Sequence, residues 1–165
     1  MMGKLYTMGC GILKGTHKER KEAFQKRICE IDTGGIGMRF VDIRKYKCGS
    51  RNGQAFSEGT GMCDLINEIW PAATYISLPC LCNAFGSTQA ALQKYAAEFR
   101  HDPNAELEFN LLLKWIREGD RAIVLLCSER KAFKPNGTSW NCHRVPLALE
   151  LLTDLGEAWG EVKHL

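Results

Sequence analysis

The sequence predicts a single α/β domain, a three-layer α/β/α architecture built on a mainly parallel, Rossmann-like sheet of five strands. Short apolar runs alternate with segments of helical spacing along the chain, which is typical of strands joined by crossover helices. The run "RAIVLLC" at 121–127 is apolar without interruption, as in a strand covered on both faces. A chain of 165 residues can bury one core, so we expect residues 1–165 to form one domain.

The first part of the chain is expected to contain two strands and one helix. "KLYTMG" predicts a strand that ends at Gly9, and residues such as Phe24 and Ile28 recur near helical spacing between about 16 and 31. The three glycines of "DTGGIG" suit the C-terminal cap of that helix. "MRFVDIR" predicts the second strand, and the stretch 45–60, rich in turn-forming residues, predicts a mobile loop.

The second part is expected to contain four helices and three strands. "GMCDLINEIW" predicts a short helix before Pro71, and "ATYISLP" predicts a strand that stops at Pro79. Two helices follow at 88–100 and 105–118, and after the strand at 121–127 come a helix at about 143–155 and a last strand, "EVKHL". The second of the paired helices is expected to bury one apolar face, formed by Leu107, Leu111, Leu112, Trp115 and Ile116.

The composition is typical of a globular protein and does not indicate a particular function. Hydrophobic residues make up 45% of the chain and charged residues 25%, and the formal net charge of +3 is too small to indicate a nucleic-acid binder by itself. No run approaches the ~18 apolar residues of a membrane span, so no membrane partner is expected. The opening "MMGKLYTMGCGILKG" does not have the pattern of a signal peptide, so the eight cysteines are expected to be thiols in the cytoplasm.

Polar and thiol side chains gather where the expected strands end. In open parallel sheets, ligands bind beyond the carboxyl ends of the strands. The residues at these ends, and at the start of the helix after the fourth strand, are Gly9, Asp42, Arg44, Pro79, Cys127, Glu129, Cys142, His143 and Arg144. We expect Gly9, Pro79 and Cys127 to help shape a binding site at this edge of the sheet.

Basic residues follow two of these strands and favour an anionic ligand, with phosphate as the first choice. They are Arg44, Lys45, Lys47 and Arg51 after the second strand, and Arg130, Lys131 and Lys134 after the fourth. A helix that opens near Cys142 adds free backbone amides and the positive end of its dipole. Arg44 and Arg144 are therefore expected to hold an anion. The alternative is that loops are simply rich in solvated basic residues.

The thiols and carboxylates allow several chemistries. Cys142, beside His143 and Arg144 at a helix start, has the surroundings that lower a thiol pKa and permit nucleophilic chemistry, although packing explains a small residue there equally well. Cys127 ends a buried strand, where a cysteine is more often inert. Glu129 and Asp42 are the expected acid/base groups.

Zinc is a minor alternative, and otherwise no cofactor or metal is expected. Cys127, Cys142 and His143, with Cys80 or Cys82, supply the right ligand types. Adjacent residues on a helix point about 100° apart, which follows from 3.6 residues per turn, so Cys142 and His143 are not expected to share one ion.

The chain resembles domain-of-unknown-function family 488, a bacterial and phage-associated family, nearly from end to end. The resemblance is carried by "YTMG", "FVDIR", "YISLPCL" and, most specifically, "LLCSE…CHR…VKHL". It points to Asp42, Arg44, Pro79, Cys127, Glu129, Cys142, His143 and Arg144. Cys10 stands where the family usually has His, "LCN" replaces a leucine-glycine-glycine, and the insert "RKAFKPNGTSW" is longer than typical. The resemblance implies the site and leaves the reaction open.

The leading hypothesis is an enzyme that acts on a phosphate-bearing nucleotide or nucleic-acid component, with Glu129 and Asp42 as acid/base groups. The first alternative is a non-catalytic module whose partner is nucleic acid or a nucleotide, with the loop aromatics Tyr46, Phe56, Phe133 and Trp140 stacking on bases. A further alternative is a thiol redox or zinc-binding protein. The oligomeric state is not predicted.

Overall fold

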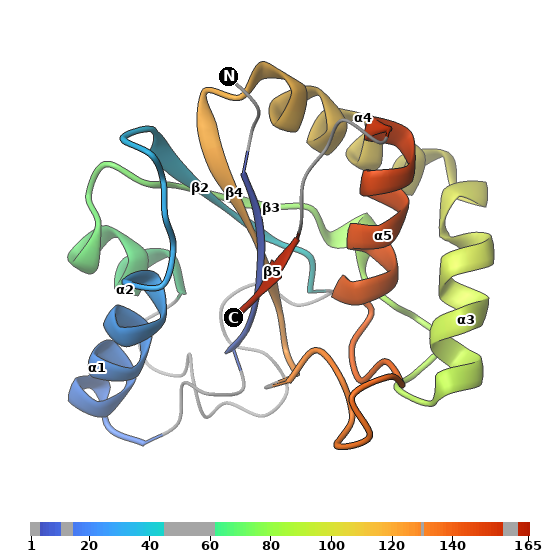
Figure 1. Ribbon diagram of the computed structural model, residues 1–165, viewed down its shortest axis with the longest axis horizontal. Coiled ribbons are helices and arrows are strands. Elements are labelled where there is room, and N and C mark those ends of the chain that lie inside the picture. The colour runs from blue at the N-terminus through green and yellow to red at the C-terminus, as the bar shows by residue number, and fades with distance from the viewer. Residues whose placement is uncertain (1–3, 11–14, 45–61, 130, 157–161) are drawn as a thin grey trace.

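Five parallel strands form one sheet, and helices cover both of its faces (Figure 1). The computed structural model describes residues 4–10, 15–44, 62–129, 131–156 and 162–165. The strand order is β3-β2-β4-β1-β5. The predicted α/β fold with a parallel five-stranded sheet is therefore confirmed. In the order of the first Rossmann half, β1 and β2 are neighbours, whereas here β4 lies between them.

Every predicted strand and helix is present in the predicted order. The elements are β1 (Leu5–Gly9), α1 (His17–Ile28), β2 (Gly37–Asp42), α2 (Met62–Ile69), β3 (Thr74–Ser77), α3 (Gln89–Glu98), α4 (Pro103–Glu118), β4 (Arg121–Cys127), α5 (Arg144–Leu155) and β5 (Lys163–His164), with 3-10 turns at Pro79–Leu81 and Phe99–His101. The expected loop at 45–60 lies outside the described residues. No helix of the described part of the chain is long and apolar enough to cross a membrane.

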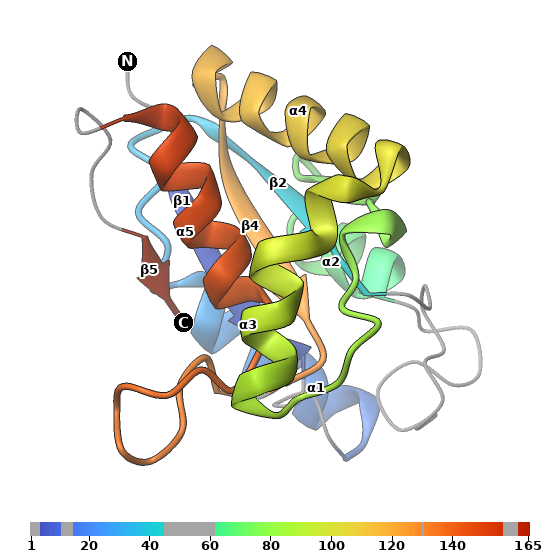
Figure 2. The same ribbon diagram turned by 90° about the vertical axis from the view of Figure 1, so that its right-hand side faces the viewer.

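The central strand β4 divides its side chains between two cores, because successive residues of a strand point to opposite faces. Ile123, Leu125 and Cys127 pack on the face that α3, α4 and α5 cover. Ala122, Val124 and Leu126 pack on the face that α1 and α2 cover. Figure 2 shows α3, α4 and α5 in front of the strands, with α1 behind them. Cys127, the last residue of β4, thus enters the core that contains α5.

Two details of the helices differ from the sequence prediction. Helix α1 begins at a capping box formed by Thr16 and Glu19, but it ends at Ile28, well before the glycines. Gly34 and Gly35, with φ of +60° and +85°, form the turn into β2 instead of a helix cap. The turn needs these positive φ values, which glycine adopts without strain.

The buried face of α4 is also rotated from the expected one. Leu107 is 68% exposed and Leu111 is 38% exposed, so the prediction that both face the core is wrong. The buried face is formed by Ala105, Phe109, Leu112, Leu113 and Ile116. Phe109 packs edge-on against Phe99 of the preceding 3-10 turn, one of the contacts that hold this face against the core.

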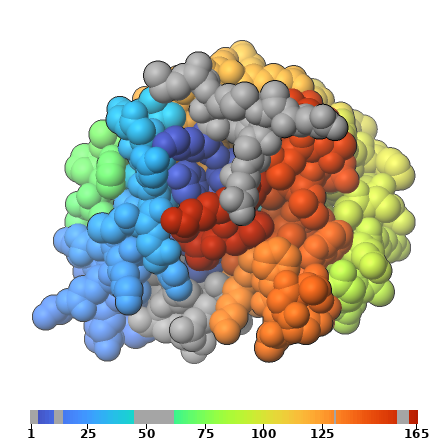
Figure 3. All heavy atoms as spheres, viewed as in Figure 1, coloured from blue at the N-terminus to red at the C-terminus, as the bar shows by residue number. Residues whose placement is uncertain are grey.

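The topology places the carboxyl end of β4 at a switch point. The connection from β1 to β2 passes through α1 on one face, and that from β4 to β5 passes through α5 on the other. Loops from neighbouring strands therefore diverge beyond β4, which is where open α/β sheets bind ligands. Strand β5 closes the β1 edge of the sheet, and the last residues, in red, lie at the surface (Figure 3).

Candidate functional site

A cavity of about 320 Å³ opens at the carboxyl ends of β2 and β4. Its wall is formed by the end of β2, the loop after β3, one residue of α3, the end of β4 and the residue before α5. The lining residues are Arg44, Cys82, Asn83, Gly86, Ser87, Leu92, Cys127, Ser128, Glu129 and His143. The pocket therefore lies at the edge of the sheet where the sequence predicts a site.

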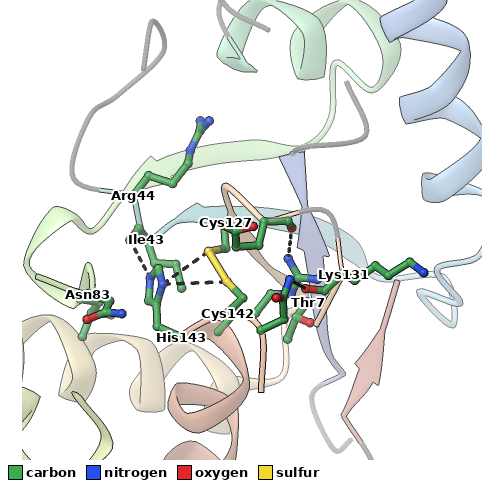
Figure 4. Close-up of a disulfide and its surroundings, with 12 residues drawn as sticks. Thr7, Ile43, Arg44, Asn83, Cys127, Lys131, Cys142 and His143 are labelled. Atoms are coloured by element: carbon green, nitrogen blue, oxygen red, sulfur yellow. Dashed lines mark hydrogen bonds between the residues drawn. A yellow bond between two sulfur atoms is a disulfide. The ribbon is translucent and has the colours of Figure 1, made fainter. Parts of the chain in front are cut away.

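Cys127 and Cys142 form a disulfide beside this pocket (Figure 4). Cys127 is the last residue of β4, and Cys142 lies in the turn before α5. Both residues are buried. The bond joins the two chain segments that the sequence indicates as the core of the site, across 15 positions of sequence.

The His143 ring lies between the two sulfur atoms and the end of β2. Its Nε2 donates a hydrogen bond to the carbonyl oxygen of Ile43 at 3.3 Å. Its Nδ1 lies 3.5 Å from Sγ of Cys127 and 3.9 Å from Sγ of Cys142. Because the carbonyl can only accept, the proton belongs on Nε2 and the lone pair of Nδ1 faces the sulfurs. Burial lowers the pKa of His143 to about 4, so the ring is neutral near pH 7.

Asp42 and Arg44 form a buried ion pair at the end of β2. Oδ1 of Asp42 accepts from Nε of Arg44 at 2.8 Å, and Oδ2 accepts from Nη2 at 2.5 Å. Tyr75 of β3 donates a third hydrogen bond to Oδ2 at 2.6 Å. Burial lowers the pKa of Arg44, but the hydrogen bonds and charge of Asp42 outweigh it and the net shift is upward. The guanidinium is therefore a fixed, permanent cation.

Arg144 is fully buried and incompletely paired. Its Nη1 donates to the backbone carbonyl of Glu129 at 2.7 Å. Its Nε and Nη2 find no hydrogen-bond partner among the described residues. Burial lowers the pKa of Arg144 to about 10, because few charges compensate the guanidinium at this position. Two unpaired buried donors of this kind are costly unless something else binds them.

The remaining predicted site residues are divided between the pocket and its surroundings. Glu129 is exposed and lines the pocket. Gly9 lies beside Cys127 in the strand register and is buried, and Pro79 opens the 3-10 turn after β3. Neither Gly9 nor Pro79 lines the cavity. Their expected contribution to substrate binding stays a prediction.

The expectation that Cys142 and His143 diverge is wrong. The ligand atoms of Cys127, Cys142 and His143 all lie within 4.8 Å of one another. Helix α5 begins at Arg144, with His143 as its N-cap residue, so Cys142 lies before the helix. The angle between successive residues of a helix therefore does not apply to this pair. Cys80 and Cys82 do not belong to this cluster.

Sequence reasoning assigned no role to Asn83, Gly86 and Ser87 of the loop after β3, or to Tyr75. Asn83 accepts a hydrogen bond from the backbone amide of Phe85 and donates to the carbonyl of Gly86, which gives the loop its turn. The signal was present, because "NAFGS" follows the third strand and belongs to the same edge of the sheet. Nothing in the sequence pairs Tyr75 with Asp42.

Part of the predicted basic and aromatic surface lies outside the described residues. This applies to Lys45, Tyr46, Lys47, Arg51, Phe56 and Arg130. Of the remaining aromatics, Phe133 packs edge-on against His164 and forms an isolated bridge with Trp140. The Phe133 ring therefore has a packing partner in β5, and the bridge pairs Phe133 with Trp140 through the backbone.

Comparisons with models of protein families, with curated proteins and with solved structures find no match to this chain. The resemblance to domain-of-unknown-function family 488 therefore stays a prediction.

Proposed function

We propose that this protein is an enzyme that acts on a small phosphate-bearing substrate, of the nucleotide class, bound in the pocket beyond β2 and β4. The main support is that one cavity is lined by the cation Arg44, the carboxylate Glu129 and the hydroxyl residue Ser128, which come from two neighbouring strand ends. The volume of about 320 Å³ lies at the lower end of the range for small-molecule sites, as a mononucleotide requires.

Arg44 supports the anion-binding part of this proposal. Its guanidinium donates two hydrogen bonds to Asp42, which also accepts one from Tyr75, so the side chain is fixed before any ligand arrives. A fixed guanidinium loses little conformational entropy when it binds a phosphate group. Figure 4 shows the Arg44 side chain directed away from the disulfide, so the cation and the sulfurs occupy different parts of the site.

The carboxylates receive different roles in this proposal. Both oxygens of Asp42 are committed to Arg44 and Tyr75, which makes Asp42 a positioning residue. Glu129 lines the pocket and is exposed, so its carboxylate can reach a bound substrate. We therefore assign general acid/base catalysis to Glu129.

The test is calorimetric titration with nucleoside mono-, di- and triphosphates, followed by chromatography of those that bind to detect turnover. Glu129→Gln is expected to keep affinity for the bound nucleotide and to lose turnover. The matched control is Glu118→Gln, which changes an exposed carboxylate at the end of α4, beside the opposite ends of the strands. This control is expected to leave nucleotide affinity and turnover unchanged. Turnover that survives Glu129→Gln contradicts the role of Glu129.

Two other outcomes separate this proposal from its alternatives. Binding of nucleotides without any turnover supports the non-catalytic binding module. Binding of the nucleoside as tightly as its phosphates contradicts anion recognition by Arg44, because a phosphate contact adds affinity that the nucleoside lacks.

A second function, thiol redox catalysis, is favoured by one specific observation. The Cys127–Cys142 disulfide lies beside the pocket, with His143 Nδ1 within 3.5 Å of Cys127. A disulfide beside a pocket can be attacked by an incoming thiolate, which starts thiol–disulfide exchange. If this is the function, the protein cycles between reduced and oxidised forms with a model disulfide, and Cys142→Ser abolishes that cycle. Cys29→Ser, which removes an exposed free thiol, leaves it unchanged.

A further inference from the structure

We propose that Cys127, Cys142 and His143, once the disulfide is reduced, bind a zinc ion beside the pocket. This metal site goes beyond the proposed function and does not depend on phosphate binding. Two thiolates and one imidazole are a ligand set that zinc prefers among biological divalent ions. The three ligands come from the end of β4 and the start of α5.

The first support is the mutual distance of the ligand atoms. All three lie within 4.8 Å of one another. Zinc binds sulfur at about 2.3 Å and nitrogen at about 2.0 Å, so two ligand atoms of a tetrahedral site lie roughly 3.3–3.8 Å apart. His143 Nδ1 is 3.5 Å from Cys127 Sγ, within this range, and 3.9 Å from Cys142 Sγ, just beyond it.

The second support is the spacing of the backbone. The Cα atoms of Cys127 and Cys142 are 7.4 Å apart. Disulfides usually join Cα atoms that are about 4.4–6.8 Å apart. Two thiolates that share one ion keep a wider separation, because their sulfurs lie on either side of the metal. The backbone of the site therefore suits a bridging ion.

The third support is the hydrogen bond that orients His143. Its Nε2 donates to the carbonyl of Ile43, which fixes the tautomer and directs the Nδ1 lone pair toward the sulfurs. Histidines that bind metals almost always donate their other ring nitrogen to a carbonyl or carboxylate in this way. Figure 4 shows the ring held between Ile43 on one side and the two cysteines on the other.

The surroundings indicate a catalytic rather than a purely structural ion. No fourth Cys, His, Asp or Glu joins the cluster among the residues that the structure describes. Cys127 and His143 both line the pocket, so a water molecule or a substrate atom can approach the ion from that side. Three protein ligands with one open position are typical of catalytic zinc, whereas structural zinc has four protein ligands.

Zinc binding requires reduction first. A phosphine reductant breaks the Sγ–Sγ bond and becomes a phosphine oxide, taking its oxygen from water, and that water supplies the two protons of the new thiols. Zinc then displaces both thiol protons as it binds. In a cytosol that keeps thiols reduced, no added reductant is needed.

The experiment uses the full chain, reduced with phosphine, freed of metal and reductant, and titrated with Zn²⁺ alone and with Co²⁺. We expect about one ion per chain, thiolate-to-cobalt charge-transfer bands, and visible bands of tetrahedral cobalt. The oxidised protein is expected to bind neither ion. His143→Gln, which keeps a side-chain donor for Ile43, is expected to weaken zinc affinity at least ~10-fold.

Cys127→Ser and Cys142→Ser are expected to abolish the charge-transfer bands or reduce them, and the matched control Cys29→Ser to leave them intact. Reduced wild-type protein that shows no thiolate-to-cobalt bands overturns the proposal, and this result does not depend on whether any variant folds. Binding that survives Cys127→Ser but is lost in Cys82→Ser assigns the ion to other ligands and also overturns it. Zinc binding without nucleotide binding leaves the metal site standing and contradicts only the proposed function.

Discussion

Two buried polar clusters lie at the ends of the neighbouring strands β2 and β4, and they differ in how far their polar groups are paired. In the β2 cluster, Asp42 receives hydrogen bonds from Arg44 and Tyr75 on both oxygens. In the β4 cluster, Arg144 keeps two donors without partners among the described residues, and the His143 Nδ1 lone pair faces only sulfur.

This difference separates a part of the site whose polar groups are paired within the fold from a part whose polar groups are not. Burying a polar group costs free energy unless a partner replaces the lost water, and the β2 cluster meets that cost within the fold. The β4 cluster does not, so its residues need another reason to be buried together. Under the two proposals above, a ligand, either a metal ion or an anionic substrate, supplies that reason.

Asp42→Asn is expected to lower the free energy of unfolding by about 3–5 kcal/mol, because it leaves the Arg44 cation buried without its counter-charge. Urea denaturation measures the loss. The control is Asp120→Asn, whose carboxylate is half exposed and forms only long contacts with arginines, and which is expected to cost less than about 1 kcal/mol. Equal effects of the two substitutions contradict a scaffold role for the β2 cluster.

Reduction of the wild-type disulfide in zinc-free buffer is expected to lower the free energy of unfolding by about 3 kcal/mol. The disulfide closes a loop of 15 residues, and opening it restores the chain entropy of the unfolded state. Urea curves with and without phosphine measure the change, and Cys142→Ser is the control that phosphine leaves unaffected. Added zinc is expected to recover stability in the reduced wild type only.

The elements of the fold could be predicted because each depends on local pattern. The run at 121–127 needs no knowledge of its neighbours to be recognised as a central strand. The rotation of α4 could not be predicted, because Leu107 and Phe109 are both apolar and tertiary contacts, such as that of Phe109 with Phe99, decide which one is buried. A local pattern predicts that a helix forms, but it does not predict which residues the helix packs against.

The position of the candidate site could be predicted from the sequence, but the roles of its residues could not. The rule that ligands bind at strand ends locates Cys127, Glu129 and Arg44. The role of Asp42 depends on Tyr75, which lies 33 residues away on another strand. The approach of Cys142 to His143 depends on whether the helix begins one residue earlier or later, and helix boundaries are the least predictable feature of a sequence.

Tyr75→Phe tests how much the hydrogen bond from Tyr75 contributes to the stability of the β2 cluster. It removes one hydrogen bond to a charged acceptor, and we expect a loss of about 1.5 kcal/mol in the free energy of unfolding. Tyr95→Phe is the matched control, since its hydroxyl donates one hydrogen bond to an uncharged acceptor, the backbone carbonyl of Leu81, and it is expected to cost about 1 kcal/mol. A Tyr75→Phe variant as stable as the wild type shows that Arg44 alone is sufficient to hold Asp42.

Arg144→Met is expected to change the free energy of unfolding least, by less than about 1 kcal/mol in either direction. Methionine fills much of the same volume, and removing a buried charge with unpaired donors offsets the loss of the bond to the Glu129 carbonyl. Nucleotide affinity, measured by calorimetry on the same variant, is expected to fall if those donors serve an anion. A loss of more than about 3 kcal/mol would place Arg144 in the same class as Asp42. Arg144 would then be part of the scaffold, and only the cysteines and His143 would remain as the unpaired part of the β4 cluster.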